Sequence, residues 1–418
     1  MLKLPLEGFR VLELAEAWAG PLGGSLLGDL GAQVIKVEAF TRYTVTRVPR
    51  AGPGRGFVGN DVTAPRPWDR YATHDMVNRN KYGIALDLRR PRGRDVLNEL
   101  IKISDVLTES FSAGTAEKLG IGYPAAKGLR PDIIMVSMPG FGVSGPYKGY
   151  VSLGSTLDAF TGHHWLRGYP DSDPTVTPVA QHTDAVGAVS LAFSVLAALH
   201  YRNRTGKGQW IDLSQVEAFL PHLARPLMDY QMNGRLPRPM GNADPAAAPH
   251  GCYRCRGEDN WVVIAVTSEE EWQALCHSLG HPEWTSDVRF STQEVRLRYR
   301  EELDALIAQW TAQRDKREVM HLLQSAGVPA QAVFDDADLY EDPHLAARGF
   351  FTKMSHTLTG EHRYPGPLWR LTGSRTPPAV APNCLGEHNE LVLGTILGMS
   401  RREVQELREE GVVGDTFR

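Results

Sequence analysis

The feature that most constrains the fold is a run of small and aliphatic residues, 185–199, that directly follows an acidic residue, Asp184. A helix that is apolar on nearly all sides is typical of a protein interior rather than of a surface. The run is also shorter than the roughly 20 residues that a membrane-spanning helix needs. We therefore expect a buried helix with Asp184 at its N-terminal end, where free N–H groups and the positive end of the helix dipole face the carboxylate.

Asp184 has two interpretations at this point. On the local pattern alone the simpler one is that Thr183 or Asp184 is an N-cap, which would stabilise the helix by about 1 kcal/mol. The alternative is that the carboxylate carries the chemistry of the protein. The rest of the sequence is needed to decide between them.

Length, charge and cysteine content limit the class of protein. With 418 residues the chain is long enough for two or three domains. A net charge of −4 argues against general binding to nucleic acids or anionic membranes. Four cysteines are too few for a disulfide framework, and residues 1–5 lack the pattern of a signal peptide. We expect a cytoplasmic protein without nucleic-acid or membrane partners.

The start of the chain has the pattern of a βαβ unit, with a strand, a helix and a second strand expected at residues 10–14, 22–30 and 33–38. The glycines of the first turn raise the question of a dinucleotide-binding fingerprint. Its spacing fails, because Pro21 stands where that fingerprint needs a bare backbone N–H. Gly23 and Gly24 are explained more simply by close packing of the helix on the sheet, so we expect no nicotinamide or flavin site.

A long irregular segment follows, and it contains Arg42, Arg47, Arg50 and Arg55. Loops of this length without regular structure are usually functional or disordered. Guanidinium groups bind phosphates through bidentate hydrogen bonds, so these arginines could clamp a phosphorylated ligand. A solvated basic loop explains them equally well, and both interpretations stay open.

Seven short motifs are distributed along the chain: GFRVLEL at residues 8–14, WAGP at 18–21, NKYGIALDLR at 80–89, ESFSAG at 109–114, SMPGFGVSGPY at 137–147, RTGKGQWIDL at 204–213 and LGEHN at 385–389. Together they resemble the family III CoA-transferases, which include formyl-CoA and carnitine CoA-transferases and the 2-methylacyl-CoA racemases. The resemblance covers essentially the whole chain. It implies an acyl-CoA:carboxylate CoA-transferase that takes the CoA thioester as a substrate, with no permanently bound cofactor and no metal.

The resemblance also implies the residues of the site. In the family, the acid at the position of Asp184 is the catalytic nucleophile. The CoA contacts carried over from the matching motifs are Trp18, Ala19, Leu86, Arg89, Ser110, Phe111, Ser112, Lys118 and Leu119. Ser110 replaces the asparagine of the family and Ala113 replaces its proline, so we expect a weaker or water-mediated contact at that loop.

One position separates the activities within the family. The racemases pair the aspartate with a histidine, so that one group removes an α-proton and the other returns it. The residue at that position here is Leu153, which favours transfer over racemisation. His163, His164 and His182 lie close in sequence and leave a displaced second base open. An accessory CoA-binding subunit of a heteromeric transferase is a further alternative.

The reaction that the resemblance implies begins with attack of the Asp184 carboxylate on a thioester carbonyl. A mixed anhydride and CoA thiolate form, the thiolate turns the aspartyl group into a thioester, and the acceptor acid then attacks that thioester. Burial raises the pKa of a carboxyl group and a helix N-terminus lowers it, so we expect opposed effects on Asp184. N–H groups at that terminus or around Gly140 would hold the oxyanion.

The fold that the resemblance implies is α/β, with a Rossmann-like large domain, a smaller α+β domain, and two subunits threaded through each other as interlocked rings. The large domain would consist of residues 1–215 and 351–418 and the small domain of residues 251–330. Residues 216–250 and 331–350 would be linkers. A homodimer and a heterodimer with a homologous subunit both fit.

Two segments depart from expected patterns. The family's glycine-rich loop, which closes over the aspartate, is matched here only by residues 241–251, which are richer in alanine and proline. Cys252 and Cys255 form a CxxC pair, but zinc needs a second pair of ligands, so we expect structural thiols.

Succinyl-CoA is one candidate donor, and the apolar Trp18 and Leu153 hint at a bulky or aromatic acceptor acid. The sequence alone identifies neither the CoA donor nor the acceptor acid.

Overall fold

The computed structural model describes residues 2–47, 64–178 and 180–418, and these form two compact units. The first unit comprises the described parts of residues 1–162, 179–228 and 346–418. The second comprises residues 163–178 and 229–345. The predicted division with linkers at 216–250 and 331–350, and the interlocked pairing of two subunits, stay predictions.

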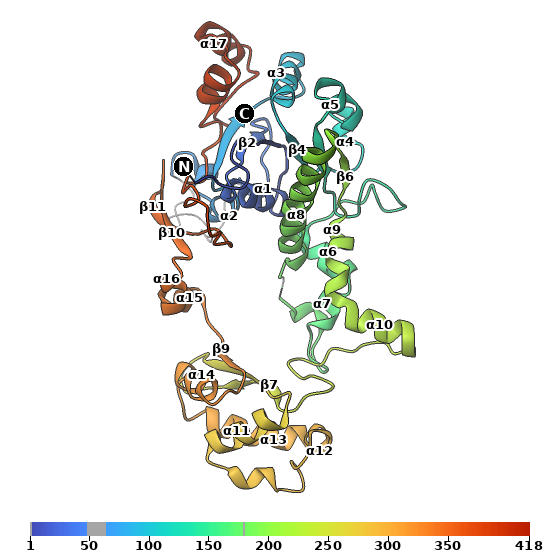
Figure 1. The fold of residues 1–418 in the computed structure, drawn as a ribbon, viewed down its shortest axis with the longest axis vertical. Coiled ribbons are helices and arrows are strands. Elements are labelled where there is room, and N and C mark those ends of the chain that lie inside the picture. The colour runs from blue at the N-terminus through green and yellow to red at the C-terminus, as the bar shows by residue number, and fades with distance from the viewer. Residues whose placement is uncertain (1, 48–63, 179) are drawn as a thin grey trace. The chain divides into compact units, whose positions relative to one another are not determined.

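The core of the first unit is a six-stranded parallel sheet (Figure 1). Its strands are β1 (Arg10–Glu13), β2 (Gln33–Glu38), β3 (Lys81–Ala85), β4 (Val106–Glu109), β5 (Ile134–Ser137) and β6 (Trp210–Asp212). They lie in the order β3-β2-β1-β4-β5-β6, and every neighbouring pair is parallel. This is the order of a doubly wound dinucleotide-binding sheet, whose topological switch point lies between β1 and β4. The predicted α/β class with a parallel sheet is therefore confirmed.

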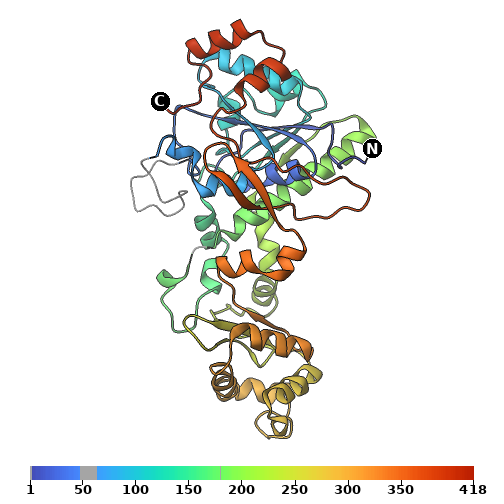
Figure 2. The ribbon, with the colours of Figure 1, turned by 90° about the vertical axis from the view of Figure 1, so that its left-hand side faces the viewer.

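Both faces of this sheet are buried. Successive side chains of a strand point to opposite sides, so alternate residues contribute to the hydrophobic cores on the two faces. Val11 and Val106 lie in one hydrophobic core, and their neighbours Leu12 and Leu107 lie in the other. The first core is shared with α1 (Ala19–Asp29) and α8 (His182–Thr205), and the second with α3 (Pro91–Lys102) and α17 (Arg401–Glu409) (Figure 2). Each buried valine or leucine contributes roughly 1.5–3 kcal/mol.

Helix α8 is longer than the apolar run that predicts it. It continues through polar residues to Thr205 and ends at Gly206, whose φ of 71° is the left-handed conformation that glycine adopts at a helix C-terminus. By length and composition the helix could cross a membrane, but half of its most apolar stretch is buried inside the protein. The prediction that the run is too short to span a bilayer therefore does not apply to the whole helix, although the burial does agree with a core helix.

Two glycines of α1 permit close packing on different partners. A Cβ atom at Gly23 would lie 2.4 Å from the side chain of Leu191 in α8, so this glycine permits helix–helix contact. A Cβ atom at Gly24 would lie 1.7 Å from a carboxylate oxygen of Glu13 in β1. The predicted packing of helix on sheet therefore holds for Gly24, whereas Gly23 faces the neighbouring helix.

The second unit contains a three-stranded antiparallel sheet in the order β7-β8-β9. Its strands are β7 (His250–Arg254), β8 (Trp261–Ala265) and β9 (Ala330–Ala332), and its longer helices are α11 (Glu269–Leu279), α13 (Arg300–Thr311) and α14 (Lys316–Ser325). Helix α11 begins with a capping box, in which Ser268 and Glu271 bond reciprocally to each other's backbone N–H. Trp272 and Cys276 lie in the core between these helices and the sheet.

The remaining elements are shorter. They are α2 (Ala72–Val77), α4 (Thr115–Lys118), α5 (Tyr123–Leu129), α6 (Gly154–Phe160), α7 (His163–Leu166), α9 (Gln215–Phe219), α10 (Ala224–Asn233), α12 (Gln293–Arg298), α15 (Asp336–Glu341), α16 (Pro343–Ala347), a π-helical turn at Leu391–Ile396, and the antiparallel hairpin β10 (Phe351–His356) and β11 (Gly360–Pro365). Of these, α6 and α9 matter most for the site, because both pack near the N-terminal end of α8.

Candidate active site

A cavity of about 760 Å³ opens in the first unit at the carboxyl ends of the central strands. Its walls come from the loop after β1 (residues 16–20), the loop after β4 (residues 110–115) and the loop after β5 (residues 139–140). The loop after β2, at residues 42–46, completes one side. In doubly wound sheets ligands bind at this edge, beside the switch point, so the fold itself marks the cavity as a ligand site.

The structure brings six of the predicted site residues to this one cavity. They are Trp18, Ala19, Ser110, Phe111, Ser112 and Asp184. Trp18 precedes the first turn of α1, and the hydroxyl of Ser110 accepts a hydrogen bond from the backbone N–H of Glu16 at 3.1 Å. This bond ties the loop after β4 to the loop after β1, so Ser110 has a structural role at the position where the family has asparagine.

The other four predicted contacts lie away from the cavity. The side chain of Leu86 is buried in the hydrophobic core, and Arg89 is largely exposed and paired with Asp87 at 2.9 Å. Lys118 is exposed at the end of α4, and Leu119 packs against the same core as Leu86. Their role in binding CoA stays a prediction.

Asp184 is the third residue of α8 and is only 8% exposed. The helix begins at His182, and its N-cap is Gln181 rather than Thr183 or Asp184 as the local pattern predicts. Gln181 reaches this position with φ of 53°, a left-handed conformation that is unfavourable for a residue with a side chain. Asp184 is therefore not needed as the cap, and it forms part of the lining of the cavity.

A second carboxylate occupies the start of α8. Asp158 of α6 is buried, and its oxygens accept hydrogen bonds from the backbone N–H of His182 at 3.3 Å and of Thr183 at 3.1 Å. The hydroxyl of Thr183 also lies 3.0 Å from the Asp158 carboxylate. The first two N–H groups of the helix, which the sequence suggested as oxyanion donors, are therefore engaged by Asp158. The loop around Gly140, which lines the same cavity, remains the candidate for that role.

The surroundings of Asp184 make its carboxyl group more basic. Burial and the nearby charge of Asp158 both raise the pKa of Asp184, to about 6. The predicted raising effect of burial is therefore confirmed, whereas the lowering effect of the helix N-terminus stays a prediction. A raised pKa of this kind is typical of a functional carboxylate.

Two strained backbone positions line the cavity. Ala17 has φ of 64° and Gln181 has φ of 53°, and such conformations cost of order 1–3 kcal/mol in residues other than glycine. Strain of this kind concentrates at functional sites. Neither residue is glycine or asparagine, so the sequence carries no signal that would have identified these turns.

The position predicted to separate transferases from racemases also lies at this cavity. Leu153 lines it, and histidine is absent from its wall as far as residues 2–47, 64–178 and 180–418 define that wall. His182 is exposed at the start of α8, and His163 and His164 belong to the second unit. Within the described structure, the second base that a racemase needs therefore has no histidine candidate on the cavity wall.

The arginines of the segment after β2 differ in their surroundings. Arg42 lines the cavity and pairs with Glu16 across its rim. Arg47 is fully buried, and its guanidinium contacts the carboxylates of Glu38, at 2.6 Å, and Asp69. Arg47 is therefore a structural residue and is unsuited to clamp a phosphate. Arg50 and Arg55 lie outside the described residues.

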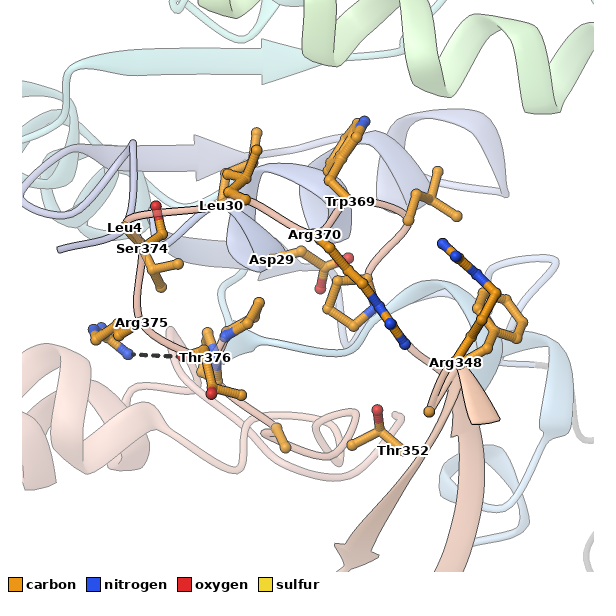
Figure 3. A pocket seen from close by; sticks show the side chains of 18 residues that line it. Leu4, Asp29, Leu30, Arg348, Thr352, Trp369, Arg370, Ser374, Arg375 and Thr376 are labelled. Carbon is orange, nitrogen blue, oxygen red and sulfur yellow. Dashed lines mark hydrogen bonds between the residues drawn. The ribbon is translucent and has the colours of Figure 1, made fainter. Parts of the chain in front are cut away.

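A second cavity in the first unit, of about 540 Å³, contains none of the predicted site residues (Figure 3). Arg348 and Arg370 project into it from the C-terminal part of the chain. Arg375 also lines it, and donates a hydrogen bond to the backbone carbonyl of Thr376 at 3.4 Å. Three arginines line this cavity, and its buried carboxylate, Asp29, differs from Asp184 because it is paired with Arg79 at 2.6 Å.

The cysteines of the CxxC motif lie in the second unit. Cys255 is buried in its core, as is Cys276, and burial raises the pKa of these thiols to about 11 and about 12. Such thiols react slowly, because the thiolate is the reactive form. Across the described ranges of the chain, no group of three or more histidines, cysteines or acidic residues is placed to hold a metal ion.

Comparison with known proteins gives the family. Residues 6–389 match the family model described as CoA-transferase family III. The chain is 32% identical over 411 residues to the succinyl-CoA–D-citramalate CoA-transferase of Chloroflexus aurantiacus, with 98% of each chain covered. It is 29% identical over 428 residues to the formyl-CoA:oxalate CoA-transferase of Rhodopseudomonas palustris, covering 98% of this chain and 97% of that one. A solved CaiB/BaiF family protein from Brucella suis has a TM-score of 0.81 and 31% identity, with 94% of this chain and 100% of that one covered.

The parallel sheet and the buried carboxylate at its switch point define an α/β protein with a ligand site at the carboxyl ends of its strands. The chain belongs to CoA-transferase family III. It is accordingly an acyl-CoA:carboxylate CoA-transferase, and the family predicted from the sequence motifs is confirmed.

Proposed function

We propose that the protein moves coenzyme A from an acyl-CoA donor to a carboxylic acid through covalent intermediates on Asp184. The observation that carries this proposal is the position of Asp184, which is buried with a pKa raised to about 6 by burial and by Asp158, in a cavity at the switch point of the sheet. A desolvated carboxylate is a better nucleophile than one in water. Near pH 7 it is nevertheless mostly ionised, so it can attack without help from a general base.

Each step of the proposed reaction transfers one acyl group. The Asp184 carboxylate attacks the thioester carbon, the carbon–sulfur bond breaks, and CoA leaves as a thiolate, which gives an aspartyl–acyl anhydride. The thiolate then attacks the aspartyl carbonyl and releases the donor acid, which leaves aspartyl-CoA. The acceptor carboxylate attacks this thioester to form a second anhydride, and the returning thiolate takes the new acyl group and restores Asp184. Backbone N–H groups around Gly140 would stabilise the developing oxyanions.

The substrates are proposed as classes. Succinyl-CoA is the proposed donor, since it is named as the donor of the Chloroflexus relative, although the Rhodopseudomonas relative is named for formyl-CoA. The acceptor is a small carboxylic acid. Trp18 and Leu153 line the cavity with apolar surface, which favours an acid with an apolar or aromatic part. The CoA moiety would run along the loops that carry Trp18 and Ser110.

We also propose a dimer. Helix α8 carries exposed apolar side chains at Val189, Phe193 and Tyr201, spaced four and eight residues apart on one face, which is typical of a surface that a partner covers. The alpha and beta subunits of a succinyl-CoA–L-malate CoA-transferase from Chloroflexus aurantiacus are each 30% identical to this chain, so a heterodimer is a second candidate. In a heterodimer this chain would be an active subunit, because it has Asp184. The cytoplasmic location stays a prediction.

The test is the intact mass of the protein after incubation with succinyl-CoA followed by hydroxylamine. Hydroxylamine converts an anhydride or thioester into a stable hydroxamate, so we expect one modification, mapped to Asp184 by peptide analysis. The variant Asp184→Asn should form no adduct and transfer no CoA. Transfer at an unchanged rate in that variant would sink the proposal. Solvent deuterium entering the α-carbon of a 2-methylacyl-CoA, without an adduct, would instead favour a racemase, and CoA binding without turnover an accessory subunit.

A further inference from the structure

We propose that the second cavity of the first unit, shown in Figure 3, binds a small organic dianion through Arg348 and Arg370. The cavity lies at the C-terminal end of α1, where Asp29 forms part of its wall. Trp18 and the candidate active-site cavity lie at the opposite, N-terminal end of the same helix. Binding of the dianion is therefore separate from the reaction proposed for Asp184 and does not depend on it.

The charged side chains of this cavity are unequally matched. Three arginines and one carboxylate, Asp29, line it. Asp29 is already neutralised by Arg79, whose guanidinium lies 2.6 Å from it. One of the three arginines, Arg375, is paired with Glu7 at 3.1 Å. The cavity therefore offers no free carboxylate to the other two arginines.

These two arginines are Arg348 and Arg370. Neither side chain forms an ion pair or a hydrogen bond with any residue that the structure describes. Both project into the cavity, Arg348 from the segment before β10 and Arg370 from the loop after β11. Like charges that face the same space repel each other, and a bound anion offsets this repulsion. The two guanidinium groups are therefore suited to bind an anion.

The chemistry of the two guanidinium groups favours a doubly charged ligand. Each group can form two parallel hydrogen bonds to the oxygens of a phosphate or a carboxylate. A phosphate monoester carries about two negative charges near pH 7 and has three acceptor oxygens. A dicarboxylate carries the same charge on two groups. We expect either dianion to bind more tightly than a monoanion, because it neutralises both arginines.

The size and walls of the cavity indicate an organic ligand and not an inorganic ion. Its volume of about 540 Å³ lies within the range of roughly 300–1,000 Å³ that is typical of small-molecule sites. Leu368 and Leu371, which line it, are 52% and 44% exposed, and Phe350 adds an aromatic side chain. Contact with an apolar part of the ligand would remove this surface from water. The ligand class is thus an organic molecule with an apolar part and a dianionic group.

Hydrogen bonds hold the walls of the cavity in place. The backbone N–H of Val380 donates to the side-chain carbonyl of Asn80 at 2.8 Å, and the N–H of Asn80 donates to the carbonyl of Val380 at 2.9 Å. The N–H of Gly366 donates to the carbonyl of Phe350 at 2.8 Å. The loop that carries Arg370 is thus tied at both ends. Binding does not have to order a free loop, which would weaken the affinity.

The experiment is calorimetric titration of the full chain with phenyl phosphate, with saturating coenzyme A present to occupy the candidate active-site cavity. We expect one binding event in the wild type. Arg348→Gln and Arg370→Gln should each weaken it by about tenfold or more, because each removes charge-assisted hydrogen bonds. Arg401→Gln is the matched control. It removes an exposed arginine of α17 that does not line the cavity, so its affinity for phenyl phosphate should equal that of the wild type.

Two further probes define the dianion. Phthalate is an aromatic dicarboxylate, and benzoate is an aromatic monocarboxylate. Tighter binding of phenyl phosphate than of phthalate would identify a phosphate monoester, and the reverse order a dicarboxylate. Benzoate should bind at least about tenfold more weakly than the better dianion. Benzoate that binds as tightly as both dianions would overturn the inference, because a single charge would then be sufficient.

The role of the two arginines has its own decisive outcomes. Unchanged affinity in both Arg348→Gln and Arg370→Gln would overturn the inference, as would the absence of binding by any of the three probes. Binding that occurs only without coenzyme A would also overturn it, since the probe would then occupy the candidate active-site cavity. Circular dichroism checks that each variant folds. If the two variants do not fold, Arg348→Lys and Arg370→Lys keep the charge but lose the bidentate geometry, and weaker binding is again expected.

Discussion

The Oδ2 atom of Asp184 lies 1.9 Å from the position that a Cβ atom would take at Gly154. No real pair of such atoms approaches so closely, so the carboxylate occupies the space that any side chain at position 154 would need. Gly154 begins α6, whose Asp158 bonds the start of α8. The glycine is therefore required by the neighbouring carboxylate and not by its own backbone conformation.

Gly154→Ala should displace the Asp184 carboxylate. A misplacement of about 1 Å at a reacting group can lower a rate by about 100-fold, and we expect a loss of CoA transfer of that order. Overpacking should also lower the free energy of unfolding by about 1–3 kcal/mol. Gly149→Ala is the matched control, because a Cβ atom there would meet nothing within 4 Å. Equal activity of the two variants in a succinyl-CoA transfer assay would show that the carboxylate can move aside without cost.

The stability of the protein should depend on the ionisation of Asp184. Its pKa is raised from 3.8 to about 6 by burial and by Asp158, so the folded protein binds this proton more tightly than the unfolded chain does. The contribution of Asp184 to stability therefore falls as the pH rises from about 4 to about 6, and above that range the full penalty, up to about 3 kcal/mol, applies.

Asp184→Asn removes this penalty. We expect the variant to be more stable than the wild type at pH 8, and the two to become nearly equal near pH 3, below both pKa values, where Asp184 is mostly protonated in both states. Urea denaturation at the two pH values measures the difference. A variant that is less stable at pH 8 would mean that the ionised carboxylate makes favourable contacts that outweigh its desolvation.

The parts of the fold that the sequence predicted depend on local pattern. The βαβ start and the long apolar helix follow from periodicity and end signals within a few residues. Asp184 was identified because it directly precedes the apolar run and because the flanking motifs resemble a family. These features can be predicted without knowing which distant segments of the chain are in contact.

What the sequence did not predict depends on distant contacts. Asp158 is one acid in a short helix, and its role becomes visible only when α6 is placed against α8. Arg47 looked like a loop residue, but its guanidinium also donates to the backbone carbonyl of Asn383 at 2.8 Å, across 336 residues of sequence. Burial of that kind cannot be derived from composition.

Arg47 and Arg42 should respond differently to substitution. Arg47→Leu leaves Glu38 and Asp69 buried without their cation, so we expect a loss of about 3–5 kcal/mol in the free energy of unfolding. Arg42→Leu breaks an exposed pair with Glu16 and should cost at most about 1 kcal/mol. Chemical denaturation of both variants checks the contrast. If Arg47→Leu instead kept its stability and raised only the KM for the acyl-CoA, Arg47 would be a ligand residue after all.

The last prediction concerns the support of the turn after β1. Glu13 is fully buried, and its carboxylate accepts hydrogen bonds from Lys36 at 2.9 Å and Lys81 at 3.0 Å. Lys36 also donates to the carbonyl of Ala15, and Lys81 to that of Pro21, so the two ammonium groups hold both ends of the turn that carries Trp18. Burial, as the main cause, lowers the pKa of Lys81 to about 7. A charge without a partner is therefore unfavourable at this site.

Glu13→Gln should therefore be among the most damaging single changes in the first unit. It leaves two buried amines without a carboxylate, and breaking a buried pair in this way costs about 3–5 kcal/mol. Lys102→Met, which breaks an exposed pair with Glu99, is the control and should stay within about 0.5 kcal/mol of the wild type. Because Lys81 can lose its proton near pH 7, the deficit of Glu13→Gln should shrink when unfolding is measured at pH 9 instead of pH 6. A deficit that does not change with pH would mean that lost hydrogen bonds, and not unpaired charge, account for the damage.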